Sequence, residues 1–168
     1  MRRQRSKTHV AASLPPASAT NKPLRSDPYS LRRKLPDPSA CTSCRALYRA
    51  GRWAWGEPPA DAAPVLCPAC RRAADDYPAG LVRLTGDYWR AHREELVQLV
   101  RHVEERERAE HPLKRIMRMR EDDGALEIAT TDARLARGIG KALKRAHHGA
   151  LQLPPTSREN VVRVLWER

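Results

Sequence analysis

Cys41-Thr42-Ser43-Cys44 and Cys67-Pro68-Ala69-Cys70 are the two stretches that decide the fold of this chain. They contain all four cysteines of the 168 residues, and 22 residues separate the two pairs. A C-x-x-C turn directs two sulfurs at one metal ion, and two such turns complete a tetrahedral site with Zn–S bonds of about 2.3 Å. The spacing therefore predicts one structural zinc ion with the ligands Cys41, Cys44, Cys67 and Cys70.

Three other interpretations of the cysteines stay open: two disulfides, a redox pair, or a different metal. Disulfides need an oxidising compartment, and the start of the chain lacks the apolar segment of a secretory signal. A redox C-x-x-C needs only one pair, usually at the start of a helix in a βαβ unit. Four thiolates leave no open coordination position on zinc, which favours a scaffold over a catalytic metal.

The positive charge is concentrated near the start of the chain. The formal net charge is +12, and residues 1–40 hold nine Lys and Arg against Asp27 and Asp37. This segment is rich in Pro, Ser, Ala and Arg and has no periodic apolar pattern, which predicts a disordered tail. It is either a solvated extension or an arm that follows acidic surfaces or phosphates. We expect a cytoplasmic protein with no membrane span, because no apolar run reaches about 18–20 residues.

The segment between the cysteine pairs carries aromatic and basic residues together. Trp53 and Trp55 have the same parity and can share one face of a short strand. They either form the small core of a zinc ribbon or stack on bases beside nearby arginines. The candidate nucleic-acid contacts in this unit are Arg45, Arg52, Trp53, Arg71 and Arg72.

Hydrophobic periodicity predicts an α+β fold for the rest of the chain. Apolar residues at helical spacing indicate a long helix from about residue 85 to Glu110, ended by Pro112. Asp123-Gly124 predicts a hairpin turn between strands at 113–120 and 125–130. A helix capped by Thr131, with Asp132 favourable at its positive N-terminal end, follows and runs to about His148, and a last strand extends from Asn160 to Glu167. The predicted order is a disordered basic tail (1–40), a four-cysteine zinc ribbon (41–72), a linker with the long helix (73–112), and a β-β-α-β unit (113–168).

The helix predicted after Thr131 has two opposite faces. One is apolar, and the other carries Arg and Lys along about 20 Å of helix axis. This is either an ordinary solvated face or a surface that binds phosphates. The candidate contacts are Arg134, Arg137, Lys141, Lys144 and Arg145 on the helix, with Lys114 and Arg115 on the hairpin.

No catalytic residue is predicted for this chain. The stretch Gly138-Ile139-Gly140-Lys141-Ala142 is not a phosphate loop, because Leu135 stands where the first glycine is needed and Ala142 follows the lysine. The sequence also lacks a His/Glu pair at metal-binding spacing and a Ser or Cys nucleophile motif. Four histidines, however, can still meet in space: His92, His111, His147 and His148.

Several short motifs resemble those of a family of small bacterial zinc-ribbon proteins. The run covers about residues 41–168 and comprises Cys41-x-x-Cys44, Gly51-Arg52-Trp53, Cys67-Pro68-x-Cys70-Arg71-Arg72, Tyr77-Pro78-x-Gly80, His111-Pro112-Leu113, Thr130-Thr131-Asp132 and Leu135-Ala136-Arg137-x-Ile139-Gly140. More distantly, the zinc pairs and the Thr-Thr-Asp helix are similar to the archaeal and eukaryotic export adaptor of the large ribosomal subunit. The bacterial family supplies no established activity, whereas the adaptor implies association with RNA or the ribosome.

The sequence thus predicts a non-enzymatic zinc-ribbon protein that binds RNA or the ribosome through its basic helix and tail. The alternative is an adaptor or regulator that uses the same zinc fold to bind a protein, without nucleic acid.

Overall fold

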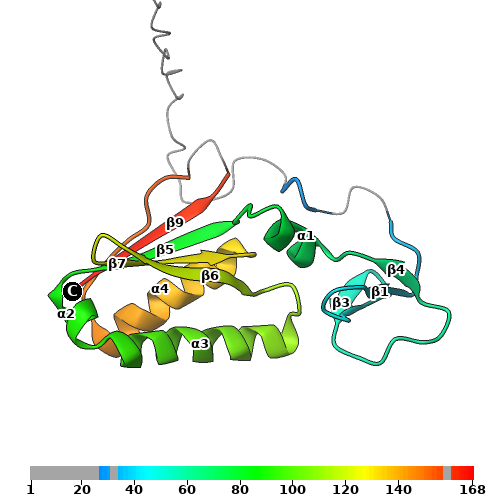
Figure 1. Ribbon diagram of the computed structural model, residues 1–168, viewed down its shortest axis with the longest axis horizontal. Helices are drawn as coiled ribbons and strands as arrows, with labels where there is room; N and C mark the ends of the chain where they lie inside the picture. The colour runs from blue at the N-terminus through cyan, green and yellow to red at the C-terminus, as the bar shows by residue number, and fades with distance from the viewer. Residues whose placement is uncertain (1–26, 31–33, 157–159) are drawn as a thin grey trace, which may run out of the picture.

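The computed structural model describes residues 27–30, 34–156 and 160–168, and it confirms the α+β class. Two sheets and four helices make up the described part of the chain (Figure 1). The first sheet is small and lies beside α1 (Pro68–Ala74). The second sheet is larger and has α3 (Arg93–Glu110) and α4 (Ala133–His147) on one face.

The small sheet is formed by residues on either side of the first cysteine pair. Its strand order is β3-β2-β1-β4, with β1 (Ser39–Cys41) and β4 (Ala63–Val65) parallel and the other pairs antiparallel. The remaining strands are β2 (Leu47–Arg49) and β3 (Arg52–Ala54). Part of the predicted disordered tail is therefore ordered, because β1 begins at Ser39 and residues 27–30 form a turn. Residues 1–26 and 31–33 lie outside the described residues.

The second sheet has five strands in the order β6-β7-β5-β9-β8. The hairpin of β6 (Ile116–Asp122) and β7 (Ala125–Thr130) turns at Asp123 and Gly124, which both have positive φ. The last strand, β9 (Val162–Glu167), pairs with β5 on one side and with β8 (Ala150–Gln152) on the other. It is thus an interior strand, as its apolar residues on both faces predict.

The central strand of this sheet lies in a segment predicted to be a linker. β5 (Gly80–Thr85) pairs antiparallel with β7 and parallel with β9. Its Val82 and Leu84 are fully buried, while Arg83 and Thr85 are half-buried on the opposite face. This alternation over six residues is a strand signal, and the prediction placed a turn and a linker there instead.

The predicted long helix is broken at His92 into α2 (Asp87–Ala91) and α3. His92 leaves helical geometry at φ −119° and ψ 28°. Its Nδ1 lies 3.1 Å from the Tyr88 carbonyl oxygen, and the two rings stack at 3.8 Å. Trp89 before the break and Leu96 after it are both buried in the core.

The core lies between the large sheet and its two helices. Trp166, Leu84, Leu96, Ile128, Leu135, Ile139 and Leu143 are among its largest fully buried side chains. No helix in the described part of the chain is both long and apolar enough to cross a lipid bilayer.

Gly140 allows α4 to lie close against the sheet. A Cβ at this position would approach Val164 Cγ1 to 2.5 Å and Leu151 Cδ1 to 2.9 Å, whereas a Cβ at Gly138 would meet nothing within 4 Å. We therefore expect Gly140→Ala to destabilise the protein by about 1–3 kcal/mol through overpacking. In contrast, the matched variant Gly138→Ala should stabilise it by about 0.5–1 kcal/mol, because alanine has the better helix propensity. Chemical unfolding of both variants checks this, and a shift of both midpoints in the same direction would contradict the packing assignment.

Candidate metal centre

Four sulfurs from two distant parts of the chain meet between the small sheet and α1. Cys41 ends β1 and Cys44 lies in the turn that follows, while Cys67 is the N-cap of α1 and Cys70 lies in its first turn. The four Sγ atoms lie within 4.8 Å of one another, and Cys44 and Cys67 are 3.7 Å apart. A zinc tetrahedron with bonds of about 2.3 Å has edges of about 3.8 Å, so the cluster has the dimensions of a single metal site.

The cysteines are neither paired nor exposed. All four are free, and the Cys44–Cys67 separation is far longer than the roughly 2.05 Å of a disulfide bond. Three of them are buried and Cys44 is half-buried. A buried set of four thiols in tetrahedral proximity has the donor chemistry of a closed, structural site for a soft or borderline metal ion.

Backbone N–H groups point at the sulfurs. Cys67 N–H donates to Cys41 Sγ at 3.3 Å, and Cys70 N–H donates to Cys67 Sγ at 3.4 Å. The turn after the first pair is closed by Arg45 N–H, which donates to the Cys41 carbonyl oxygen at 3.0 Å. Because the N–H groups that reach sulfur stabilise negative charge, they favour thiolates over thiols.

The thiols differ in acidity because burial and hydrogen bonding compete. Burial raises the pKa of Cys41, but backbone hydrogen bonds from Cys44, Cys67 and Ser43 outweigh it and lower the pKa to about 6. Burial raises the pKa of Cys44, and it raises that of Cys67 further. In the absence of metal the cluster therefore holds protons that a bound cation must displace.

Arg115 brings a positive charge from the second half of the chain to this cluster. Its Nη2 lies 3.2 Å from Cys70 Sγ and 3.5 Å from Cys67 Sγ. Burial acts to raise the pKa of Cys70, but hydrogen bonds from Ser43 and Arg115 outweigh it and lower the pKa. Arg115 thus offsets part of the negative charge that four thiolates would place around a divalent ion.

Further contacts hold the cysteine cluster against α3 and the start of the hairpin. Leu113 packs on the cluster, and Trp55 Nε1 donates to the Arg108 carbonyl oxygen at 2.6 Å. Lys114 forms an ion pair with Glu107 of α3 at 2.6 Å, which fixes the start of the hairpin on that helix. The small sheet and the large sheet are joined by the hydrogen bond of Trp55 and by the contacts of Arg115 with the sulfurs, in addition to the chain itself.

The predicted nucleic-acid contacts near the cysteines fall into two groups. Arg45, Arg52 and Arg71 are exposed, and Trp53 packs half-buried against the cysteine cluster. The side chains of Arg72, Lys114 and Arg115 are instead held in internal contacts. Their charges are already paired with Asp27, with Glu107 and with the sulfurs, and their contact with nucleic acid stays a prediction.

The predicted contacts on α4 form one face of that helix. Arg134, Lys141, Lys144 and Arg145 are exposed and Arg137 is half-buried, opposite a buried face that includes Leu135, Ile139 and Leu143. Asp132 accepts hydrogen bonds from the N–H groups of Arg134 and Leu135 as the N-cap, and no acidic residue lies within the helix. Among the described residues, no ion pair involves the four exposed cations. We call this set of five basic residues the basic face of α4.

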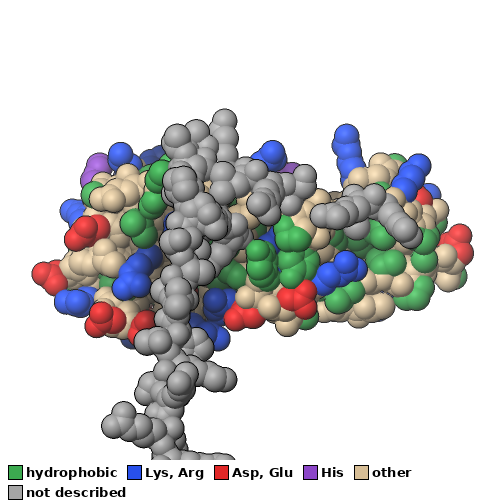
Figure 2. All heavy atoms as spheres, turned by 90° about the horizontal axis from the view of Figure 1, so that it is seen from above, with side chains coloured by type: hydrophobic (Ala, Val, Ile, Leu, Met, Phe, Trp, Pro, Cys, Tyr) green, Lys and Arg blue, Asp and Glu red, His purple; other side chains and the backbone are tan. Residues whose placement is uncertain are grey.

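The face of the large sheet that α3 and α4 leave open carries charges of both signs, unlike the basic face of α4. Figure 2 shows this side of the molecule, where acidic and basic side chains are interspersed. Arg118 of the hairpin forms an ion pair with Asp76, so it does not extend the basic face of α4.

Sequence patterns did not reveal a cavity of about 550 Å³ between α4 and the segment at residues 27–30. Asp27, Pro28, Arg72 and Tyr77 line one part of it, and the first turn of α4 with Arg134 and Arg137 lines another. The sequence signal available for this site is weak: an Asp-Pro-Tyr-Ser turn inside a segment of disordered composition.

The described histidines do not form a metal site. His92 and His147 both contact Tyr88, whose hydroxyl lies 3.2 Å from His147 Nδ1. In the part of the chain that the structure describes, the four cysteines are the one group of side chains arranged to hold a metal ion.

Comparisons of the chain with models of protein families, with curated proteins and with solved structures found no match. The resemblance to zinc-ribbon proteins and to the export adaptor therefore stays a prediction from the motifs.

The contact of Arg115 with the sulfurs can be tested by metal affinity. We expect Arg115→Ala to weaken metal binding by about 10–100-fold, the usual effect of removing an outer-shell partner of a metal ligand. Arg120→Ala removes an exposed arginine from the same hairpin and should leave the affinity unchanged. Competition with a chromophoric chelator measures both variants, and equal affinities would contradict the proposed role of Arg115.

Proposed function

We propose that the protein holds one zinc ion as a structural centre and binds RNA, free or in the ribosome, through the basic face of α4. The single observation that supports RNA binding most strongly is this face. Its exposed cations lie on one rigid helix, and that helix contains no acidic residue. Regularly spaced cations on one rigid element match the regularly spaced phosphates of a nucleic-acid backbone.

Zinc is the metal that best suits four cysteine sulfurs in a small, closed cluster. Cys41, Cys44, Cys67 and Cys70 would hold it, and the bound ion would supply on the order of 10–16 kcal/mol of folding free energy. Under this proposal residues 41–72 form a zinc ribbon, which is joined to the body that contains the five-stranded sheet with α3 and α4. The ribbon has little apolar core of its own, so the metal is its main source of stability.

Removal of the metal should unfold the ribbon before the large sheet. The described cluster beside β1–β4 consists mainly of the cysteines with Ala46 and Ala69, whereas Trp166 and a set of Leu, Ile and Val residues stabilise the large sheet. We expect a strong chelator under reducing conditions to release one zinc per chain and to increase amide exchange in residues 39–70. Exchange in β5, β7 and β9 should stay slow. Equal exchange in the ribbon with and without chelator would contradict a structural metal.

Acidification should release the same metal. Metal binding requires thiolates, and Cys44 and Cys67 have raised pKa values, so falling pH shifts these sulfurs to the protonated form, which does not bind zinc. The affinity should therefore rise with pH and fall on acidification, with proton release when zinc binds. Isothermal titration in buffers of different ionisation enthalpy measures the number of protons. A pH-independent affinity with no proton release would exclude thiolate ligation.

RNA binding can be tested with two variants of equal net charge. Lys141→Gln, Lys144→Gln and Arg145→Gln together remove three cations from the basic face of α4. Arg49→Gln, Arg101→Gln and Arg106→Gln remove three cations from other elements. For a labelled 20-nucleotide oligouridylate, the first variant should bind more weakly and show a salt-dependence slope lower by about 2, given about 0.7 per phosphate contact on a single strand.

The control variant should bind like the wild-type protein. Equal losses in the two variants would show attraction by net charge alone and would contradict an interface on α4. Sedimentation of tagged protein with ribosomal subunits, with and without nuclease, separates RNA binding from the alternative. A partner retained after RNase and DNase treatment would favour a protein-interaction adaptor.

A further inference from the structure

The cavity of about 550 Å³ lies where distant parts of the chain meet. Most of its lining comes from the turn at residues 27–30, from α1 with the loop before β5, and from the first turns of α4. Pockets that hold small molecules and cofactors usually have volumes of about 300–1,000 Å³. The cavity is therefore large enough for one nucleotide, and its place at the start of α4 puts it next to the basic face of that helix.

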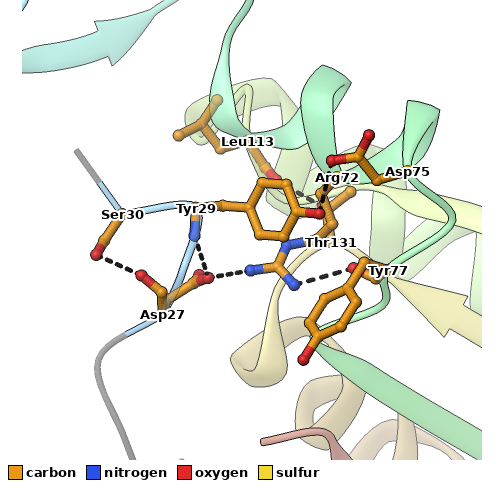
Figure 3. A network of polar contacts seen from close by, with 8 residues as sticks. All are labelled: Asp27, Tyr29, Ser30, Arg72, Asp75, Tyr77, Leu113 and Thr131. Carbon is orange, nitrogen blue, oxygen red and sulfur yellow. Dashed lines mark hydrogen bonds and ion pairs between the residues drawn. The ribbon is translucent and has the colours of Figure 1, made fainter. Parts of the chain in front are cut away.

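Arg72 fixes one wall of this cavity. Its side chain is only 3% exposed, forms an ion pair with Asp27, and donates to the Tyr77 carbonyl oxygen at 2.9 Å. The guanidinium carbon lies 4.4 Å from the centroid of the Tyr29 ring and 5.8 Å from that of Tyr77, and Figure 3 shows it between the two rings. The Tyr29 hydroxyl also donates to Asp75 Oδ2 at 2.7 Å. A wall held by such contacts is formed before a ligand arrives, which lowers the entropy cost of binding.

Tyr77 lines the cavity with an aromatic side chain that is partly accessible. The residue is 37% exposed, to a degree that few other large hydrophobic residues of the described chain reach. An aromatic ring that stays accessible in a cavity is a surface on which a nucleic-acid base can stack, and such stacking tolerates any base. The ring is therefore the group of this lining that can bind a base.

The charges of the lining are of both signs. Arg134 lines the cavity from the first turn of α4, is exposed, and belongs to the basic face of that helix. Asp27 and Asp132 lie in the same lining, and each is fixed by hydrogen bonds from backbone N–H groups. Two fixed carboxylates disfavour a phosphate deep in the cavity, whereas they can accept hydrogen bonds from the N–H groups of a base. This arrangement suits a base inside the cavity with its phosphate at Arg134.

The basic face of α4 connects this cavity with the rest of the helix. At a rise of 1.5 Å per residue, Lys141 lies about 10 Å beyond Arg134 along the helix axis, and Lys144 and Arg145 follow. An RNA strand whose phosphates follow this face thus reaches Arg134 beside the cavity. A nucleotide at that end can turn its base into the cavity, because the bases of single-stranded RNA are not held in a duplex.

We propose that this cavity binds one nucleotide of the RNA, with the base against the Tyr77 ring and its phosphate on Arg134. This inference rests on the proposed function and adds to it a site for a base, which the basic face of α4 alone does not supply. Tyr77 and Arg134 contact the nucleotide. Arg72 and Tyr29 are positioning residues, because they hold the wall that carries the Tyr77 ring.

The test compares two labelled oligomers of equal length and charge: the 20-nucleotide oligouridylate and an abasic oligomer with the same ribose-phosphate backbone. The wild-type protein should bind the oligouridylate more tightly, because only this oligomer can place a base in the cavity. Tyr77→Ala should weaken oligouridylate binding by about tenfold and leave binding of the abasic oligomer unaffected. Tyr77→Phe keeps the stacking ring and should keep the preference. Leu153→Ala should keep it as well, because it removes a similarly exposed side chain outside the cavity.

Arg134→Gln tests the phosphate contact separately. It should weaken the binding of both oligomers by the same factor and lower the salt-dependence slope by about 0.7, the value for one phosphate contact on a single strand. A loss confined to the oligouridylate, or an unchanged slope, would contradict a phosphate on Arg134.

Cross-linking tests the site in the wild-type protein, and so it is decisive even where Tyr77→Ala does not fold. An oligouridylate that carries 4-thiouridine forms adducts under ultraviolet light with residues beside its bases, and peptide mapping should find an adduct on Tyr77. Adducts confined to other parts of the chain would overturn the site. Displacement of the oligouridylate by micromolar uridine monophosphate would also overturn it, because the cavity would then serve free nucleotides.

The outcomes distinguish this inference from the proposed function. Wild-type oligouridylate binding by Tyr77→Ala, while the variant with glutamine at 141, 144 and 145 binds more weakly, would overturn the nucleotide site and leave the proposed function intact. Absence of oligouridylate binding by the wild-type protein would overturn the proposed function, and with it this inference.

Discussion

The small sheet and its attachment to the rest of the described chain depend on four cysteine sulfurs, which can be ionised together only where positive charge compensates them. Four sulfurs within 4.8 Å of one another repel when ionised and lose solvation when buried. The protein itself supplies two sources of positive potential. Backbone N–H groups donate to the sulfurs of Cys41 and Cys67, and the Arg115 guanidinium lies beside those of Cys67 and Cys70. A divalent cation at the centre would supply the remainder. The site therefore combines local turns with one long-range contact, and this contact links the small sheet to the hairpin of the large one.

The distribution of arginines shows that their number alone says little about function. Arg72, Arg115 and Arg118 make contacts within the protein, where they pair with Asp27, with sulfurs and with Asp76. The cations of α4 have a different environment, because the helix lacks acidic residues and its N-cap Asp132 is occupied by two backbone N–H groups. The basic residues of this protein thus fall into two groups: some stabilise the fold through internal contacts, and those of α4 face solvent.

Local patterns predicted those features that depend on residues close together in sequence. The C-x-x-C pairs, the positive-φ turn at Asp123 and Gly124, and the two faces of α4 follow from spacings of two to four residues, and the structure has all of them. The sequence reasoning overlooked the alternation of β5, and the place of this strand at the centre of the sheet follows only from its pairing with β7 and β9. It also missed the partner of Cys70, since Arg115 is 45 residues away, and the docking of residues 27–30 on Arg72. These are long-range pairings, and periodicity within a short window carries no information about them.

The position of β5 has a consequence for the order in which the protein is made. Its parallel neighbour β9 is formed by residues 162–167, about 80 residues later in the chain. All four cysteines have been synthesised once the chain reaches Cys70, and only the contacts with Leu113 and Arg115 come later, so the cluster can assemble early, at the rate of local loop closure. The middle of the large sheet, in contrast, must wait with one edge of β5 unpaired until the last strand has been synthesised. Between these two events the nascent chain exposes the unpaired edge of β5, which can pair with another chain. A short synthesis time or a chaperone would protect this edge.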